Sequence, residues 1–156
     1  MRMNSNMQKL YGKLDSSKIS AINLNHNLHK LLIPKFVKVH DTILLKTQKK
    51  LTKVSIDAFP DLTGYECFVN HVHIEDYIES VCSQKELFKQ GLSFATMLAN
   101  ELKLSFPNKP FWVILSVNKS SCNVRFHQLR KDERWLADNI EEYTKEAIMV
   151  LETEGQ

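Results

Sequence analysis

The sequence is poor in the residues with which small secreted or metal-stabilised domains hold their folds together. It has three cysteines, Cys67, Cys82 and Cys122, an odd number without C-x-x-C spacing. This pattern indicates neither a disulfide framework nor a zinc knuckle. With only 4 Gly and 4 Pro in 156 residues, collagen-like and low-complexity chains are also excluded. At 43% apolar residues, a chain of this length can bury a core of its own.

Long hydrophobic runs are absent as well. A membrane span needs roughly 18 apolar residues, whereas the longest run here, Phe111–Leu115, has the length of a buried strand. Residues 1–14 are polar and lack the hydrophobic core of a signal peptide. We therefore expect a cytoplasmic protein without membrane contact, in which residues 1–14 are flexible and residues 15–156 form a single domain.

Glycine-rich phosphate loops and the G-x-S-x-G nucleophile elbow do not occur in the sequence. Their absence argues against P-loop and Rossmann nucleotide sites and against a hydrolase nucleophile of that type, and no cofactor is predicted. Lysines cluster between Lys35 and Lys53, but no recognition-helix, zinc-finger or clustered-aromatic pattern accompanies them. Because basic charge alone gives only non-specific affinity, the sequence does not favour a nucleic-acid partner.

Charge is distributed unevenly along the chain. Residues 1–53 hold 11 basic and 2 acidic side chains, net +9, and residues 54–131 hold 8 of each. Residues 132–156 hold 2 basic and 8 acidic side chains, net −6, so the whole chain carries +3. A basic beginning and an acidic end favour contact between the two, and they are also compatible with two patches for two partners.

Hydrophobic periodicity gives the expected elements. The clearest is a helix over Gln84–Lys103, which begins with a capping box formed by Ser83 and Glu86. A hairpin of strands follows, with Phe111–Val117 buried on both faces and Asn118–Ser121 as its turn. The other predicted elements are a helix ending near Leu32, strands over Thr42–Thr47, Leu51–Phe59, Tyr65–Ile74 and Ala147–Leu151, and a short helix over Trp135–Tyr143. Because strands occur in adjacent runs, this order favours an α+β fold with a largely antiparallel sheet and helices mainly on one face.

Two histidines suggest one candidate site. His71 and His73 are two residues apart on a predicted strand, so both imidazoles face the same side and can approach one metal ion. His127 and Asp57 complete such a site only if their strands are neighbours. The alternative is a solvent-facing or hydrogen-bonded histidine pair at the end of a strand.

The sheet face opposite the main helix is expected to carry many polar side chains. The predicted registers place on it Lys53, Ser55, Asp57, His71, His73, Asn123, Arg125 and His127. Such a face can be solvated, bind a partner, or form an active site with histidine as acid or base and arginine holding an anion. The enzymatic alternative is a small metal-dependent or histidine-based hydrolase that uses His71, His73 and His127.

The stretch from Arg125 to Asp138 contains basic residues, an acidic turn and Trp135. Tryptophan and arginine are frequent energetic anchors of protein interfaces, and the acidic residues that follow suit a basic partner. The predicted partner-binding residues are Arg125, His127, Arg130, Glu133, Trp135, Asp138, Glu141 and Glu142. The alternative is that Trp135 covers the core while the charges pair locally.

Three segments of the C-terminal third, Arg125–His127, Glu133–Asp138 and Ala147–Leu151, resemble parts of small bacterial immunity proteins. These one-domain cytoplasmic inhibitors neutralise the toxin domains of contact-dependent and other polymorphic toxin systems. The resemblance implies a non-enzymatic protein whose partner is a cognate toxin domain. It does not imply a particular fold or oligomeric state. Only residues 132–156 carry the acidic charge that inhibitors of basic nuclease toxins often have.

Overall fold

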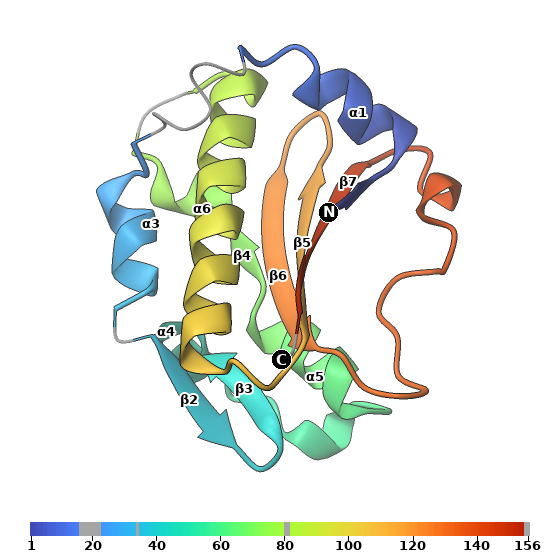
Figure 1. Ribbon diagram of the computed structural model, residues 1–156. Helices are drawn as coiled ribbons and strands as arrows, with labels where there is room; N and C mark the ends of the chain where they lie inside the picture. Colours follow the sequence, from blue (N-terminus) through green and yellow to red (C-terminus); the bar gives the residue numbers. More distant parts are fainter. Residues whose placement is uncertain (16–22, 34, 80–81, 155–156) are drawn as a thin grey trace.

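The computed structural model describes residues 1–15, 23–33, 35–79 and 82–154. At its centre is a five-stranded antiparallel sheet with the strand order β1-β7-β5-β6-β4 (Figure 1). Its strands are β1 (Arg2–Met3), β4 (Val72–His73), β5 (Phe111–Val117), β6 (Cys122–Gln128) and β7 (Ala147–Thr153). The expected α+β class with an antiparallel sheet is confirmed. No helix in the described ranges has both the length and the apolarity that a membrane crossing requires.

The predicted hairpin is the centre of this sheet. β5 pairs with β6 on one side, from Phe111 opposite Gln128 to Val117 opposite Cys122, and with β7 on the other side. Because both faces of the sheet are covered, five of the seven positions of β5 are buried. In β6 the side chains alternate, and those of Cys122, Val124 and Phe126 enter the larger core.

Helix α6 (Gln84–Ser105) lies across one face of the sheet, as the sequence predicts (Figure 1). Its N-terminus begins with the expected cap, since the Ser83 hydroxyl accepts a hydrogen bond from the Glu86 amide at 3.2 Å. Phe88, Phe94 and Leu98 are fully buried between the helix and the sheet. Burial of such side chains supplies most of the stability of a domain of this size.

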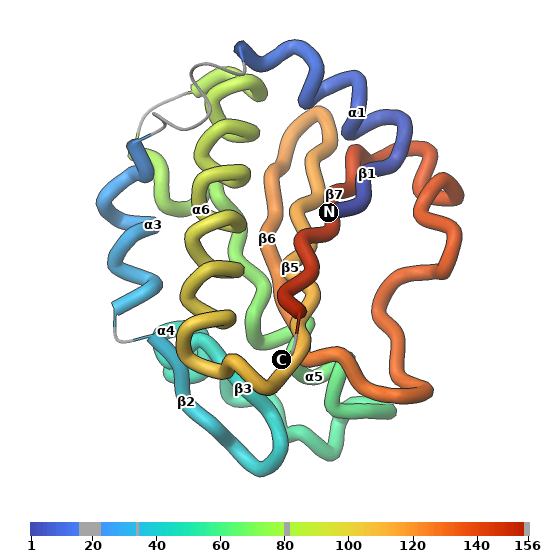
Figure 2. Tube along the Cα trace, in the orientation of Figure 1, coloured from blue at the N-terminus to red at the C-terminus, as the bar shows by residue number. Residues whose placement is uncertain are grey.

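The N-terminal residues differ from the expectation of a flexible segment. β1 pairs with the final strand β7, and helix α1 (Ser5–Tyr11) then packs with Met7 fully buried. Asn4 joins the two ends of the chain: its side-chain oxygen accepts from the amides of Met7 and Ile148. The first and the last strand of the chain, β1 and β7, therefore lie side by side (Figure 2).

A second, two-stranded sheet lies at one end of the molecule. It is an antiparallel hairpin of β2 (Phe36–Val39) and β3 (Thr42–Leu45), and its turn holds His40 in the left-handed region at φ 52°. The surrounding helices are α3 (His26–Leu31), α4 (Lys46–Leu51) and α5 (Leu62–Val69), with short 3-10 turns η1 (Ile56–Ala58) and η2 (Ile74–Tyr77). The predicted helix end near Leu32 is confirmed. The helix begins at His26 with Asn25 as its N-cap, so residues 23–25 precede it, and residues 16–22, where it was expected to begin, lie outside the described residues.

Four predicted elements are wrong or too long. The strand predicted over Thr42–Thr47 ends at Leu45, and α4 begins at Lys46. Residues 51–59 form the end of α4, a loop and η1 instead of a strand, and Tyr65–Val69 belong to α5. Asp61 explains the change at Tyr65–Val69, because its carboxylate accepts from the Gly64 amide and caps a helix where a turn was expected. Residues 135–143 are irregular apart from one 3-10 turn, η3 (Ile140–Glu142).

An irregular connection, residues 129–146, joins β6 to β7 and covers the second face of the sheet. It runs from the α5 end of the sheet to the α1 end (Figure 2). Its Leu136 and Ile140 form a separate apolar cluster with Ile114, Ile148 and Val150 of the sheet. The sheet therefore lies between α6 and this connecting segment.

Gly91 of α6 lies where the helix approaches the hairpin most closely. A Cβ atom at this position would clash with Cys122 Sγ and lie 3.0 Å from Leu115 Cδ1. Although alanine favours helix by about 1 kcal/mol, we expect Gly91→Ala to lower the free energy of unfolding by about 1–3 kcal/mol because of overpacking. Urea denaturation measures this loss. If the contact with Cys122 causes it, Gly91→Ala/Cys122→Ala loses less than the sum of the single variants; additive losses would contradict the packing.

Candidate functional site

The candidate site is the connecting segment 129–146 together with the sheet face beneath it. Side chains of this face alternate with those that meet α6, and they include Ile114, Arg125 and His127. Most of the predicted partner-binding residues lie on this segment or under it. Three hollows of the surface also include residues of this segment. The structure of this segment therefore determines which of the predicted residues are free to bind a partner.

One end of the segment is fixed by a buried ion pair. Glu66 of α5 is fully buried, and its carboxylate accepts from both terminal nitrogens of Arg130, at 2.8 and 3.0 Å. The same carboxylate accepts from the amides of Ile43 and Gln128. Burial alone would lower the pKa of Arg130, but hydrogen bonding to and charge attraction by Glu66 outweigh it and raise that pKa. Arg130 is thus a structural residue.

The rest of the segment is held at several further points. Glu133 accepts from the Thr63 amide at the start of α5, at 2.9 Å. The Tyr143 hydroxyl accepts from the Ala137 amide, which closes the segment on itself. At the other end, both oxygens of Glu141 accept from the amide of Ser5. A long irregular connection that is fixed in this way presents its exposed side chains in defined positions.

Arg125 lies on the sheet beneath Trp135. Its guanidinium carbon is 4.9 Å from the centre of the Trp135 ring, in a cation–π arrangement. One terminal nitrogen is 2.9 Å from Nε2 of His71. Since a guanidinium only donates, His71 Nε2 must accept, and the imidazole is neutral. Burial, the charge of Arg125 and the neighbouring His73 lower the pKa of His71 to about 4.

A pocket of about 250 Å³ lies between this part of the sheet and the segment. Ile114, Ser116, Arg125 and Ile148 of the sheet line it, and Trp135, Leu136, Tyr143 and Glu146 come from the segment and its junction with β7. We call it the Arg125 pocket. It combines an apolar lining with two side chains of opposite charge.

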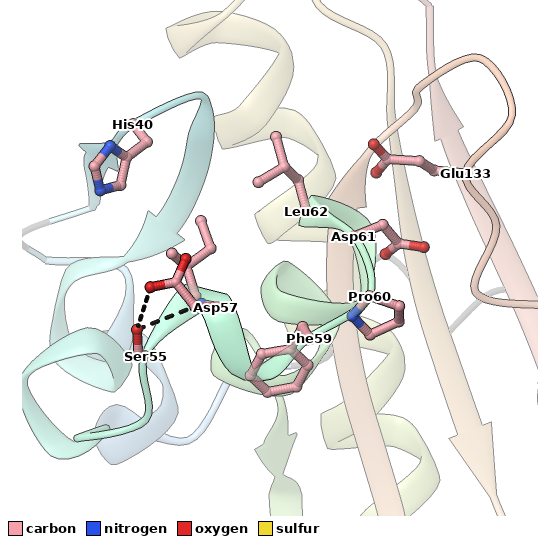
Figure 3. A pocket seen from close by; sticks show the side chains of 9 residues that line it. His40, Ser55, Asp57, Phe59, Pro60, Asp61, Leu62 and Glu133 are labelled. Atoms are coloured by element: carbon pink, nitrogen blue, oxygen red, sulfur yellow. Dashed lines mark hydrogen bonds between the residues drawn. The ribbon is translucent and has the colours of Figure 1, made fainter.

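A wider and more open cleft of about 670 Å³ lies at the α5 end of the segment (Figure 3). Its polar side chains include Asp57, Asp61 and Glu133, with His40 on the hairpin turn at the other side (Figure 3). The carboxylates are used locally: Asp57 accepts from the Ser55 hydroxyl at 3.3 Å, while Asp61 caps α5. The cleft is acidic, with Phe59 among its apolar lining residues.

The predicted partner-binding residues differ in their contacts and in their exposure. Arg130, Glu133 and Glu141 are engaged in the contacts that fix the segment, and His127 is fully buried with Nδ1 donating to the Gln128 carbonyl. Burial also lowers the pKa of His127. Trp135, Asp138, Glu141 and Glu142 are exposed, and Arg125 is half-buried beneath Trp135. Asp138 forms an ion pair with Arg134, which lies four positions earlier in the sequence.

The polar sheet face is only partly as predicted. His71, Asn123 and Arg125 do lie together, and the rings of His71 and His73 are 4.3 Å apart. Lys53, Ser55 and Asp57 are not on it, because residues 51–59 form no strand. Within the described residues, no group of three or more histidine, cysteine, aspartate or glutamate side chains is arranged to hold a metal ion.

Sequence reasoning missed Glu66, Asn70 and Tyr143. Asn70 complements Glu66, because its side-chain oxygen accepts from the Leu45 amide and its nitrogen donates to the carbonyls of Ile43 and Phe126. The i, i+4 spacing of Glu66 and Asn70 would have placed them on one helix face. The apolar pattern of Tyr65–Ile74 predicts a strand, and this prediction hides the helical spacing of the two residues.

The structure defines an α+β domain whose antiparallel sheet lies between one long helix and one ordered, irregular segment. The chain belongs to a family described as the Uncharacterized protein PM0498 family, whose model matches residues 2–155. The match thus includes the whole sheet and the candidate site. No curated protein and no solved structure matches the chain.

Glu66→Gln tests the buried ion pair. The amide keeps the size of the side chain but removes the charge that compensates Arg130, so we expect a loss of about 3 kcal/mol in the free energy of unfolding. Urea denaturation measures this loss. Glu142→Gln, which changes an exposed carboxylate of the same segment, should lose less than about 0.5 kcal/mol. Equal losses in the two variants would contradict the role given to Glu66.

The state of His71 can be tested by pH. Its pKa is about 4 in the folded protein against 6.5 in an unfolded chain, so the unfolded state binds more protons between these values. Folding stability is therefore lost as the pH falls from 6.5 towards 4. We expect His71→Gln, which can still accept from Arg125, to lose less stability between pH 7 and pH 5 than the wild type. Urea denaturation at both values measures the difference; an exposed-site control, His26→Gln, should behave like the wild type.

Proposed function

We propose that this protein is a non-enzymatic binding protein and that the segment 129–146 is its docking surface for a partner protein. The observation that carries this proposal is the position of Trp135. Its side chain is 39% exposed and rests on the guanidinium of Arg125. It stands on a connection that is fixed at both ends by Arg130 and Glu141.

A fixed docking surface binds with a smaller entropic cost than a flexible one. The contacts of Arg130, Glu133 and Glu141 order the segment before any partner arrives, so less free energy is spent on ordering it at the interface. An exposed tryptophan on an ordered loop is the kind of side chain that contributes most to protein interfaces. This supports Trp135 as the central contact.

The charges around Trp135 favour a basic partner. Asp138 and Glu142 are exposed on the segment, and the cleft at the α5 end adds Asp57, Asp61 and Glu133. Opposite charge on a partner would steer the encounter and fix its orientation. We infer a toxin domain with a basic surface, in keeping with the resemblance of the C-terminal third to immunity proteins.

The alternative function, a hydrolase using His71, His73 and His127, receives less support. His127 is fully buried, and Nε2 of His71 is occupied by Arg125. Cys67 and Cys122 offer no better nucleophile, since burial raises the pKa of both thiols. The docking surface therefore accounts for more of the observed geometry than a histidine-based site.

Affinity purification of the tagged protein from its native host tests the proposal. We expect one stoichiometric partner with a toxin domain, recovered with wild-type protein and with Leu104→Ala but depleted with Trp135→Ala. Leu104 is a suitable control because it is exposed on α6, in the layer on the other side of the sheet. With purified partner, Trp135→Ala should weaken the affinity about tenfold or more.

Growth provides a second readout. Cells that make the partner alone should stop growing, and co-production of wild-type protein or Leu104→Ala should restore growth better than Trp135→Ala. Equal affinity and equal protection by the three proteins would contradict the proposed surface. The absence of any stoichiometric partner would contradict the proposed function itself.

A further inference from the structure

The Arg125 pocket contains two opposite charges that do not neutralise each other. Arg125 and Glu146 both line it, yet no ion pair within 4.0 Å joins them in the described part of the chain. The guanidinium contacts a neutral imidazole and an aromatic ring. The Glu146 carboxylate accepts from the Ser116 hydroxyl at 2.5 Å. Within the described residues, the direct contacts of each charge are therefore with neutral groups, and the two charges act on each other only across the pocket.

Arg130 of the same protein shows how a carboxylate of the fold can pair with a guanidinium directly. Its guanidinium binds the Glu66 carboxylate through both terminal nitrogens. Arg125 is also partly withdrawn from water. This burial lowers the pKa of its guanidinium, and the charge of Glu146 is among the influences that raise it. A half-buried guanidinium that no carboxylate of the described residues contacts directly can still gain interaction energy, and a ligand can supply such a carboxylate.

The lining of the pocket restricts the ligand further. A simple anion would be attracted by Arg125 and repelled by Glu146. A simple cation would be attracted by Glu146 and repelled by Arg125. A molecule with a carboxylate and an ammonium group satisfies both. The side chains of Ile114, Leu136 and Ile148, with the two aromatic rings, suit an apolar substituent on the same molecule.

Size gives a third restriction. At about 30 Å³ per water molecule, a pocket of about 250 Å³ has room for about eight waters. This volume sets an upper limit to the part of a ligand that the pocket can hold, and a small molecule fits within it. A free α-amino acid with a branched or unbranched aliphatic side chain fits within this limit, and its ammonium and carboxylate groups are attached to the same carbon atom.

We infer that the Arg125 pocket binds a free aliphatic α-amino acid, with its carboxylate on Arg125 and its ammonium group near Glu146. The aliphatic side chain would lie among Ile114, Leu136 and Ile148. Trp135 forms one wall, so the amino acid would be bound directly beneath the exposed tryptophan. This inference goes beyond partner binding and does not depend on it.

Calorimetric titration of the full chain with L-leucine tests the inference. Binding is expected with a Kd of about 1 mM or tighter, so that about 10 mM ligand saturates the site. Two analogues remove one charge each: N-acetyl-L-leucine lacks the ammonium group and L-leucinamide lacks the carboxylate. Each should bind at least about tenfold more weakly, which is the cost of about 1.4 kcal/mol. Because the analogues are used with wild-type protein, this test does not depend on whether a variant folds.

Variants and spectroscopy locate the ligand. Arg125→Gln and Glu146→Gln should each weaken binding about tenfold or more, whereas Arg134→Gln and Glu142→Gln, which change exposed charges outside the pocket, should not change it. In nitrogen–proton correlation spectra, L-leucine should shift the indole signal of Trp135, which Trp135→Phe identifies. No heat and no shift with leucine, valine, methionine or alanine would overturn the inference. Equally tight binding of either analogue would also overturn it, because the pocket would then recognise one charge only.

Discussion

The carboxylate of Glu66 is the group on which the arrangement of the second sheet face depends. It is fully buried and accepts hydrogen bonds from three separate parts of the chain: the hairpin at Ile43, the end of β6 at Gln128, and Arg130 at the start of the connecting segment. A buried carboxylate without these donors would be very costly. Its four acceptor positions are filled, so α5, the small sheet and the segment can be assembled in one arrangement only.

A buried ion pair of this kind is better understood as a source of specificity than of stability. Desolvation of two charges offsets much of their attraction, and apolar replacements of the same size are often as stable. Apolar side chains, however, would not determine where residue 130 lies relative to Ile43 and Gln128. The directional bonds of Glu66 and Asn70 do determine it, and they thereby set the path of the segment that carries Trp135.

Features that depend on residues close together in the sequence could be predicted, whereas features that depend on contacts between distant residues could not. The helix over residues 84–105 and the hairpin were predictable because capping and periodicity are local properties. Helix α5 was not, because alternating apolar residues near Tyr65 resemble a strand while the deciding cap, Asp61, was interpreted as part of a turn. In the site, Trp135 and Arg125 were identified by residue type. Their contact and the bond of Arg125 to His71 depend on strand pairing, which composition cannot give.

Arg125 and Arg130 lie five positions apart in the sequence and have opposite relations to their surroundings. Both terminal nitrogens of Arg130 are bound to a carboxylate of the fold, so this end of its guanidinium is not available to a ligand. Arg125 is instead held by acceptors that leave its charge uncompensated: the lone pair of His71 and the ring of Trp135. A neutral imidazole can orient a guanidinium without neutralising it, and the low pKa of His71 keeps the imidazole neutral across physiological pH. One arginine thus completes the fold, while the other is oriented by it and keeps its charge for an external group.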